Sequence, residues 1–195
     1  MQLSSTLAFP MVMKSAIDLG LLDIISRAGS GTYLSPQQIA SQLHTNNPEA
    51  PQMVDRILRL LASYSVVTCK LGVGDDLGSV QIRLYGLTPV GKYFLQNNQE
   101  ENSLSPCVKL SINKVFMETW YDQKDAVLEG GVPFNRVYGM HAYEYLGKDP
   151  KFNQIFNKAM TNYSTMNTNA ILGKYKGFEN IKQLVDVLLW IWIDP

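Results

Sequence analysis

The sequence is poor in the residue types and motifs on which most enzyme chemistry depends. It contains two cysteines, Cys69 and Cys107, and two histidines, His44 and His141. The cysteines match no zinc or disulfide spacing, and neither histidine belongs to a helical metal pair or stands beside a nucleophile motif. GxGxxG, P-loop and GxSxG sequences are also missing. We therefore expect no metal site, and the absence of these motifs leaves no catalytic centre indicated by sequence pattern.

A surplus of charge and a long hydrophobic run are missing as well. Lys+Arg and Asp+Glu number 17 each, so the chain has no general electrostatic attraction for nucleic acid or anionic lipid. The N-terminal segment lacks the basic region and long apolar core of a signal peptide. The apolar run at residues 184–193 is about half the ~20 residues that a membrane span needs. We expect a cytoplasmic protein that binds neither nucleic acid nor membrane.

The residues that are present favour a packed, helical N-terminal region. Hydrophobic residues make up 46% of the chain, enough for a core. Helical spacing predicts one helix over residues 3–19, with Pro10 as a kink or start, and a second over 21–28. The first is apolar enough to be either a core helix or a dimer surface. Ser35 and Gln38 form a capping-box pattern before a third helix, with Ile39, Ala40 and Leu43 on its inner face.

A fourth helix and a hairpin complete a winged-helix pattern. The helix, over residues 51–65, carries an apolar stripe formed by Met53, Ile57, Leu60, Leu61 and Tyr64. Strands are predicted over 66–71 and 80–87, joined by a glycine-rich turn, and Thr88-Pro89 opens another helix. A winged helix suggests DNA binding, but the fourth helix is mostly apolar and the turn contains Asp75 and Asp76. We favour a structural or dimerising role.

The second half of the chain is predicted to be helical and to end in a strand. A polar run over 96–105 reads as a linker, and Ile112, Phe116, Trp120, Lys124 and Val127 lie on one helical stripe. A short helix is expected over 141–146 and a long one from Asp149-Pro150 to about Lys174. The aromatic stripe of this long helix either packs in the core or forms a wall for a flat ligand; its members are Phe152, Phe156, Met160 and Tyr163.

Residues 183–187 are typical of the first buried strand of a Rossmann-type sheet. The strand is apolar and β-branched, with Asp186 near its end. A nucleotide-binding sheet turns on glycines at this point and opens a helix whose amides receive the cofactor. Here Leu188-Leu189-Trp190-Ile191-Trp192-Ile193 follow instead. We therefore expect an incomplete cofactor domain, and an aggregation-prone segment where the glycines would stand.

Several long segments closely resemble the plant caffeic acid O-methyltransferases of the lignin and phenylpropanoid pathway. They include MKSAIDLGLLDII, DRILRLLASYSVV, METWYDQKDAVLEGGVPFNRVYGMHAYEYLGKDPKFNQIFNKAM and YKGFENIKQLVDV, and the resemblance runs from near Met1 to Val187. It implies a homodimer, S-adenosylmethionine as methyl donor, and phenolic substrates such as caffeic and 5-hydroxyferulic acids. It also implies that the winged helix dimerises.

The resemblance assigns roles to individual residues. Phe152, Phe156 and Met160 match the family's substrate wall, and Tyr163 stands where a histidine is common. Leu110 and Ser111 replace a Met-Asn pair that lines the substrate pocket. Ser164 is the implied cofactor contact, and Asp186 is a remnant of the cofactor site. The family's glycine turn and its histidine base match nothing in this sequence, so no catalytic residue is assigned.

We thus predict a mainly α protein: a winged-helix dimerisation domain (1–96), a helical substrate-pocket segment (97–177), and the truncated first strand of a Rossmann-type methyltransferase domain (178–195). The expected function is methyl transfer from S-adenosylmethionine to a phenolic hydroxyl, with this chain inactive alone because the donor site and base are missing. The alternative is a non-catalytic partner that dimerises with itself or with full-length relatives.

Overall fold

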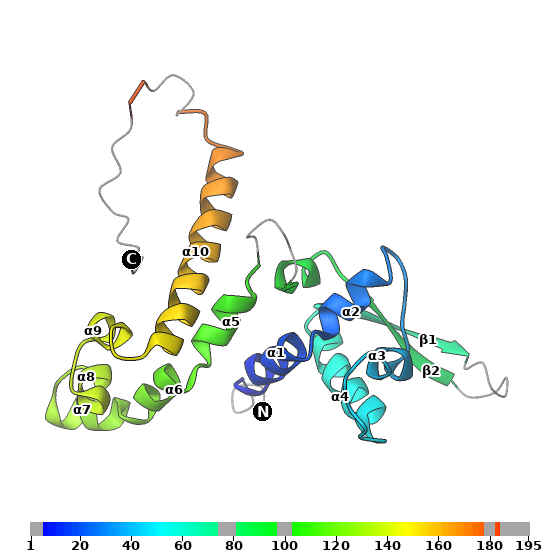
Figure 1. Cartoon of the computed structure of the whole chain (residues 1–195), viewed down its shortest axis with the longest axis horizontal. Helices are drawn as coiled ribbons and strands as arrows, with labels where there is room; N and C mark the ends of the chain where they lie inside the picture. The colour runs from blue at the N-terminus through cyan, green and yellow to red at the C-terminus, as the bar shows by residue number, and fades with distance from the viewer. Residues whose placement is uncertain (1–5, 74–80, 97–102, 178–181, 184–195) are drawn as a thin grey trace.

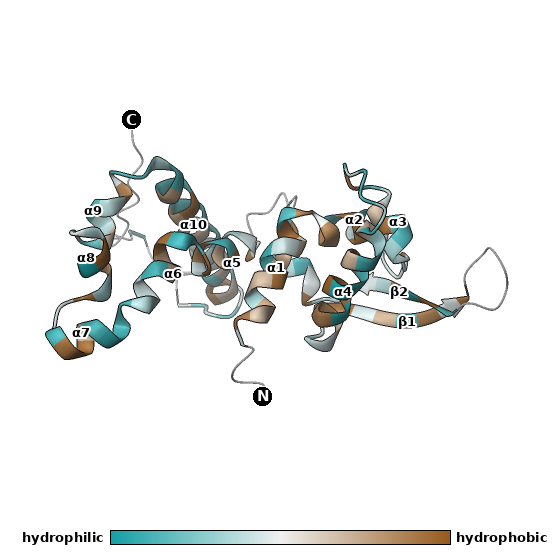
Figure 2. Cartoon of the chain, turned by 90° about the horizontal axis from the view of Figure 1, so that it is seen from below, coloured by the Kyte–Doolittle hydropathy of each residue, from teal (hydrophilic) through white to brown (hydrophobic). Residues whose placement is uncertain are grey.

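The computed structural model describes residues 6–73, 81–96, 103–177 and 182–183 (Figure 1). Within them the chain is mainly helical, with one two-stranded sheet. Elements up to the hairpin form an N-terminal region, and the helices from α5 (Ser105–Ser111) to α10 (Pro150–Leu172) form a second region beside it, with the hairpin projecting at the far end (Figures 1 and 2). No helix among the described residues is long and apolar enough to cross a membrane.

The N-terminal region packs four helices around one core. They are α1 (Ala8–Asp18), α2 (Leu21–Arg27), α3 (Pro36–Ala40) and α4 (Ala50–Ser63). Pro10 lies in the first turn of α1, where its missing N–H costs nothing, and Gly20 adopts a left-handed φ of 65° that turns the chain into α2. The predicted capping box is present, with Ser35 and Gln38 exchanging side-chain and backbone hydrogen bonds at the start of α3. Leu43 packs on the core although α3 ends before it.

The buried face of α4 overlaps the predicted apolar stripe in part: Leu61 is buried and Ile57 packs on the core, as predicted. Val54, Leu58 and Leu61 are buried, whereas Met53 and Tyr64 are about half exposed. The ring of Tyr64 stacks on Phe9 of α1 at 4.1 Å between centroids. The predicted stripe was wrong at Met53 and Tyr64, because the apolar residues of this segment lie on more than one face.

The hairpin pairs β1 (Val67–Val73) with β2 (Gln81–Leu87) in antiparallel register, with Cys69 opposite Tyr85. Both strands were predicted. The helix expected after Thr88 is only a 3₁₀ turn, η2 (Gly91–Phe94), which begins where the Thr88 hydroxyl accepts a hydrogen bond from the Gly91 amide. The same hydroxyl donates to the carbonyls of Ser65 and Val66, so this turn is fastened to the start of β1.

The helix stripe expected over 112–127 is interrupted: Ile112 follows one short helix, and the rest of the stripe is divided between two more. These are α5 (Ser105–Ser111), α6 (Lys114–Tyr121) and α7 (Gln123–Glu129). Asn113 caps α6 by accepting a hydrogen bond from the Val115 amide, which breaks the continuity with α5. Trp120 and Val127 consequently face solvent, at 63% and 83% exposed.

Three more helices complete the second region. They are α8 (Pro133–Tyr138), α9 (Ala142–Leu146) and α10 (Pro150–Leu172). The predicted start of α10 is confirmed, because the Asp149 carboxylate accepts a hydrogen bond from the Phe152 amide. The strand expected over 183–187 lies outside the described residues, apart from Gln183.

Candidate functional site

The candidate site is built on the packing of α10 against α5. Ala159 is fully buried in this contact, and the Cys107 thiol lies 3.5 Å from its carbonyl oxygen. Burial raises the pKa of the Cys107 thiol, so the group stays neutral. One turn further on, the buried Asn162 amide donates a 2.9 Å hydrogen bond to the Ser103 carbonyl. These contacts fix the position of α10 along α5.

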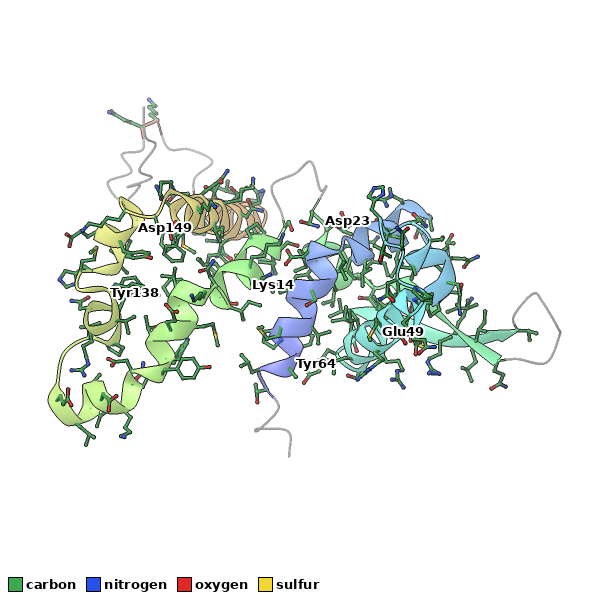
Figure 3. The ribbon with its side chains drawn as sticks, turned by 60° about the horizontal axis from the view of Figure 1, so that its bottom comes forward. Lys14, Asp23, Glu49, Tyr64, Tyr138 and Asp149 are labelled. Carbon is green, nitrogen blue, oxygen red and sulfur yellow. The ribbon has the colours of Figure 1, made fainter. Side chains whose placement is uncertain are left out.

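An aromatic cluster fills the space between α10 and helices α6, α8 and α9. The Phe152 ring lies 5.3 Å from Phe116 and 5.9 Å from Tyr145, both in edge-to-face geometry. Phe134 and Tyr138 extend the cluster across α8, 4.9 Å apart. Figure 3 shows Tyr138 and Asp149 within this second region, and Lys14, Asp23, Glu49 and Tyr64 within the first. The cluster is a hydrophobic floor of rings in contact.

One polar pair closes the cluster at its outer side. The Tyr138 hydroxyl donates a 2.6 Å hydrogen bond to Glu118. Burial raises the pKa of Tyr138, and the Glu118 carboxylate raises it further. In return, the hydrogen bond from Tyr138 lowers the pKa of Glu118. At neutral pH the phenol therefore keeps its proton and the carboxylate keeps its charge, which makes this pair structural and not a proton-transfer couple.

The sequence-predicted pocket residues divide into two groups. Leu110 and Phe152 are buried in one cluster, and the partly buried Phe156 packs on it. Met160 and Tyr163, on the next turns of α10, are 40% and 50% exposed. Along α10, the residues of the predicted stripe therefore change from buried at Phe152 to solvent-exposed at Met160 and Tyr163.

The remaining predicted site residues are not part of the cluster. Ser111 and Ser164 are exposed, at the end of α5 and on α10. Asp186 lies outside the described residues. The structure thus brings Leu110, Phe152 and Phe156 together, while the expected cofactor contacts stand apart from them.

Sequence reasoning missed Ser103 and Asn162, which fasten the two helices together. Each is at most 5% exposed. Ser103 was assigned to a polar linker, and Asn162 carries a polar side chain of the kind usually found on the solvent-facing side of a helix. Only the packing of α10 on α5 buries them, so no local pattern marks them.

The start and end of the predicted linker are anchored to the first region. The Gln96 amide N–H donates to Asp23 at 3.1 Å, and its side chain donates to the Ile17 carbonyl at 2.5 Å. At the end of the linker, the Ser105 hydroxyl donates to the Phe94 carbonyl at 2.5 Å, and Lys109 of α5 forms a 2.9 Å ion pair with Asp18 of α1. The described ends of this segment therefore hold the two regions together.

The described residues contain no cluster of three or more His, Cys, Asp or Glu side chains able to hold a metal ion. Exposed His141 places its Nδ1 3.2 Å from the Asn135 amide, and His44 lies in the exposed loop after α3. Neither histidine belongs to the aromatic cluster. The described part of the cluster consists of packed aromatic and apolar side chains, and the Glu118 carboxylate beside it is held by the Tyr138 hydroxyl.

Comparisons with known proteins give this arrangement a family. A family model described as an O-methyltransferase dimerisation domain matches residues 1–97, and one described as an O-methyltransferase domain matches 120–188. Caffeic acid 3-O-methyltransferase 1 of Populus kitakamiensis is 55% identical over 96% of this chain and 50% of its own length. The enzyme of Medicago sativa is 53% identical over the same shares. The chain thus spans about half the length of the curated relatives it matches.

Solved structures agree at the level of the fold. Human N-acetylserotonin methyltransferase in complex with SAM matches with a TM-score of 0.67 at 16% identity, covering 90% of this chain and 47% of that one. The pyocyanin biosynthetic protein PhzM matches with a TM-score of 0.64 at 21% identity, covering 90% and 46%. With both family models in chain order and 55% identity to a curated relative, the chain belongs to the plant O-methyltransferase family that includes the caffeic acid 3-O-methyltransferases.

Proposed function

We propose that this chain supplies the dimerisation and phenol-binding part of an S-adenosylmethionine-dependent O-methyltransferase that acts on caffeic or 5-hydroxyferulic type phenylpropanoids. The observation that carries the proposal is the aromatic stripe of α10, in a chain 55% identical to a caffeic acid 3-O-methyltransferase. Phe152 and Phe156 of this stripe pack in the ring cluster, and Met160 and Tyr163 are exposed beyond it. A planar phenylpropanoid suits such a surface, because offset stacking and a thioether contact favour flat rings.

Each predicted residue has a role in this proposal. Leu110 and Phe152 support the floor from within, and Phe156 and Met160 offer the ring and thioether surface to the substrate. Tyr163 and Ser111 border that surface with hydroxyls, which can hydrogen-bond the phenolic or carboxyl oxygens of the substrate. Ser164 and Asp186 are assigned to the methyl-donor side. We place the dimerising winged helix at 1–96, the pocket segment at 97–177 and the start of the methyltransferase sheet at 178–195.

We further propose that residues 1–195 alone do not transfer a methyl group. Methyl transfer needs a base and a donor positioned together at the phenolic hydroxyl. The side chains of both histidines are exposed, and Leu188 follows the predicted strand where a glycine turn would let the cofactor approach. The test is a turnover assay of the purified chain with caffeic acid and methyl-labelled S-adenosylmethionine. Product above a no-protein blank would refute inactivity.

Binding is measured separately from turnover. Calorimetric titration of the chain with caffeic acid, and then with S-adenosylmethionine, measures binding of the phenol and of the methyl donor separately. We expect weak binding of the phenol and none of the donor. Met160→Ala should weaken phenol binding while Ala170→Gly, on an exposed turn of the same helix, should not. Equal phenol binding by both variants would remove α10 as the substrate wall.

A second candidate function is a non-catalytic partner that dimerises with itself or with full-length relatives. The exposed apolar residues of the first region favour it: Leu7 and Met11, about one helical turn apart, are 51% and 46% exposed, and half-exposed Tyr64 stacks on neighbouring Phe9. Apolar side chains gathered in this way are typical of an interface. Co-expression with a full-length relative and size-exclusion chromatography tests it. Recovery of only the full-length homodimer would eliminate this function.

A further inference from the structure

The outer edge of β2 is only partly paired. Leu34 and Tyr85 form an isolated antiparallel bridge, in which the Leu34 amide donates to Tyr85 at 3.0 Å and the Tyr85 amide donates to Leu34 at 2.8 Å. In an antiparallel ladder the backbone groups of alternate residues point to the same side. The N–H and C=O groups of Arg83 and Gln81 therefore point to the side that Leu34 occupies, away from β1.

The chain itself cannot continue this pairing. Directly after Leu34, Ser35 caps α3 and Pro36 begins it, so the backbone turns into a helix and the next residue has no N–H to donate. Among the described residues, no backbone hydrogen bond reaches the outer side of Arg83 or Gln81. Unpaired edges of this kind are templates for another strand.

A cavity lies where the next residues of an added strand would go. Its volume is about 380 Å³. The unpaired part of β2 forms one wall, and the starts of α3 and α4 form the other; the lining residues are Gln81, Ile82, Arg83, Pro36, Gln37, Pro51, Gln52, Asp55 and Arg56. An extended segment entering this cavity would meet backbone groups on one side and amide and proline side chains on the other.

The charge of the cavity favours an acidic occupant. Asp55 accepts hydrogen bonds from Tyr85 at 2.8 Å and from Arg83 at 3.1 Å, and it also lies 3.5 Å from Arg59. Its negative charge is therefore compensated within the protein. Arg56 is exposed and forms no ion pair with the described residues. A carboxylate carried by the occupant would find this guanidinium at the rim.

We propose that this cavity binds an extended peptide segment of a partner protein, which pairs with β2 as a third strand and places an acidic side chain on Arg56. Strand addition obtains affinity from backbone hydrogen bonds and specificity from alternate side chains. This peptide site lies beside the β1–β2 hairpin of the first region, whereas the proposed phenol surface lies on α10. The peptide proposal is therefore independent of the methyl-transfer proposal.

The test is a titration of the ¹⁵N-labelled chain followed by amide chemical shifts. The probe is a blocked pentapeptide of alternating valine and glutamate, with a second probe in which lysine replaces glutamate and a third that carries N-methylated amides at alternate positions. We expect shifts at residues 81–84 and Arg56 with the glutamate probe. N-methylation should weaken binding at least about tenfold, since it removes the backbone donors.

Two pairs of variants separate the contacts. Gln81→Pro removes an outward N–H that β1 does not use, a substitution that edge strands tolerate, while Gln81→Ala keeps it. Arg56→Ala should weaken the glutamate probe about three- to fivefold, whereas Arg27→Ala on α2 should not. The proposal is overturned if residues 81–84 do not shift, if the N-methylated or lysine probe binds equally well, or if duplex DNA shifts these amides while the peptides do not.

Discussion

The hydroxyl of Tyr85 donates a 2.8 Å hydrogen bond to the carboxylate of Asp55, joining β2 to α4. Tyr85 is fully buried, and this burial raises the pKa of its phenol, with the hydrogen bond to Asp55 raising it further. The same carboxylate accepts from Arg83, so two residues of β2 converge on one residue of α4. This contact fixes the hairpin against the helices, and Asp55 and Arg83 also line the cavity beside β2.

Replacing Tyr85 by phenylalanine should destabilise the first region. The ring would still fill its place, but the Asp55 carboxylate would lose a donor, at a cost of about 1–2 kcal/mol. Urea unfolding followed by circular dichroism measures the change. Tyr93→Phe, at a ring that is 51% exposed, is the control and should change stability by less than about 0.5 kcal/mol. Equal stability of the two variants would show that the Tyr85 bond contributes nothing net.

The ion pair between α1 and α5 should make stability depend on pH. Burial by itself would raise the pKa of Asp18, but Lys14 and Lys109 outweigh it and lower the pKa from its usual 3.8. Because the folded-state pKa is the lower one, the stabilisation is present above about pH 4 and is lost as the pH falls through the folded-state value. Asp18→Asn should be less stable than wild type at pH 7, and the difference should shrink as the pH falls through the lowered folded-state pKa of Asp18.

This pH effect should be small, since both side chains are 30–40% exposed and salt screens them. Denaturant midpoints across the pH range provide the measurement, with Asp125→Asn as control. The control residue is largely exposed and lies 4.0 Å from Lys124. A constant difference between Asp18→Asn and wild type from pH 7 to pH 3 would contradict the assignment.

Enlarging Ala159 should separate α10 from α5. The residue is fully buried, with the Cys107 thiol 3.5 Å from its carbonyl oxygen, so a leucine has no space. Overpacking of this kind costs about 1–3 kcal/mol. Ala170→Leu, on an exposed turn of α10, is the matched control. Thermal unfolding of both variants decides the point, and a wild-type midpoint for Ala159→Leu would mean that this contact is loose.

Replacing single residues of the aromatic stripe by alanine should show which of them stabilise the fold by packing. Phe152 is 2% exposed. Its replacement by alanine should lower the free energy of unfolding by about 3–5 kcal/mol, because a cavity would remain among the rings. Met160 is 40% exposed, and its replacement by alanine should cost less than about 1 kcal/mol. Parallel urea titrations give both values. Similar losses would show that the two residues contribute equally to the core.

Several elements could be predicted from sequence because their signals are local. The capping box of Ser35 and Gln38, the hairpin, and the start of α10 at Asp149 each depend on residues within one turn or one pairing of strands. The division of 112–127 into separate helices was missed, although Asn113 is a good cap. The apolar periodicity continues on both sides of Asn113, because one interrupted turn hardly shifts a 3.6-residue repeat, and the segment therefore looks like one helix.

The sequence by itself determined the family, the capped starts of α3 and α10 and the two strands of the hairpin, because these depend on residue identity and short-range spacing. Only the tertiary structure decided which face of α4 is buried, that Asn162 donates to Ser103, and that β2 has an unpaired edge beside a cavity. These features join segments that are far apart in the chain. Their energies come from contacts that no local window of sequence contains.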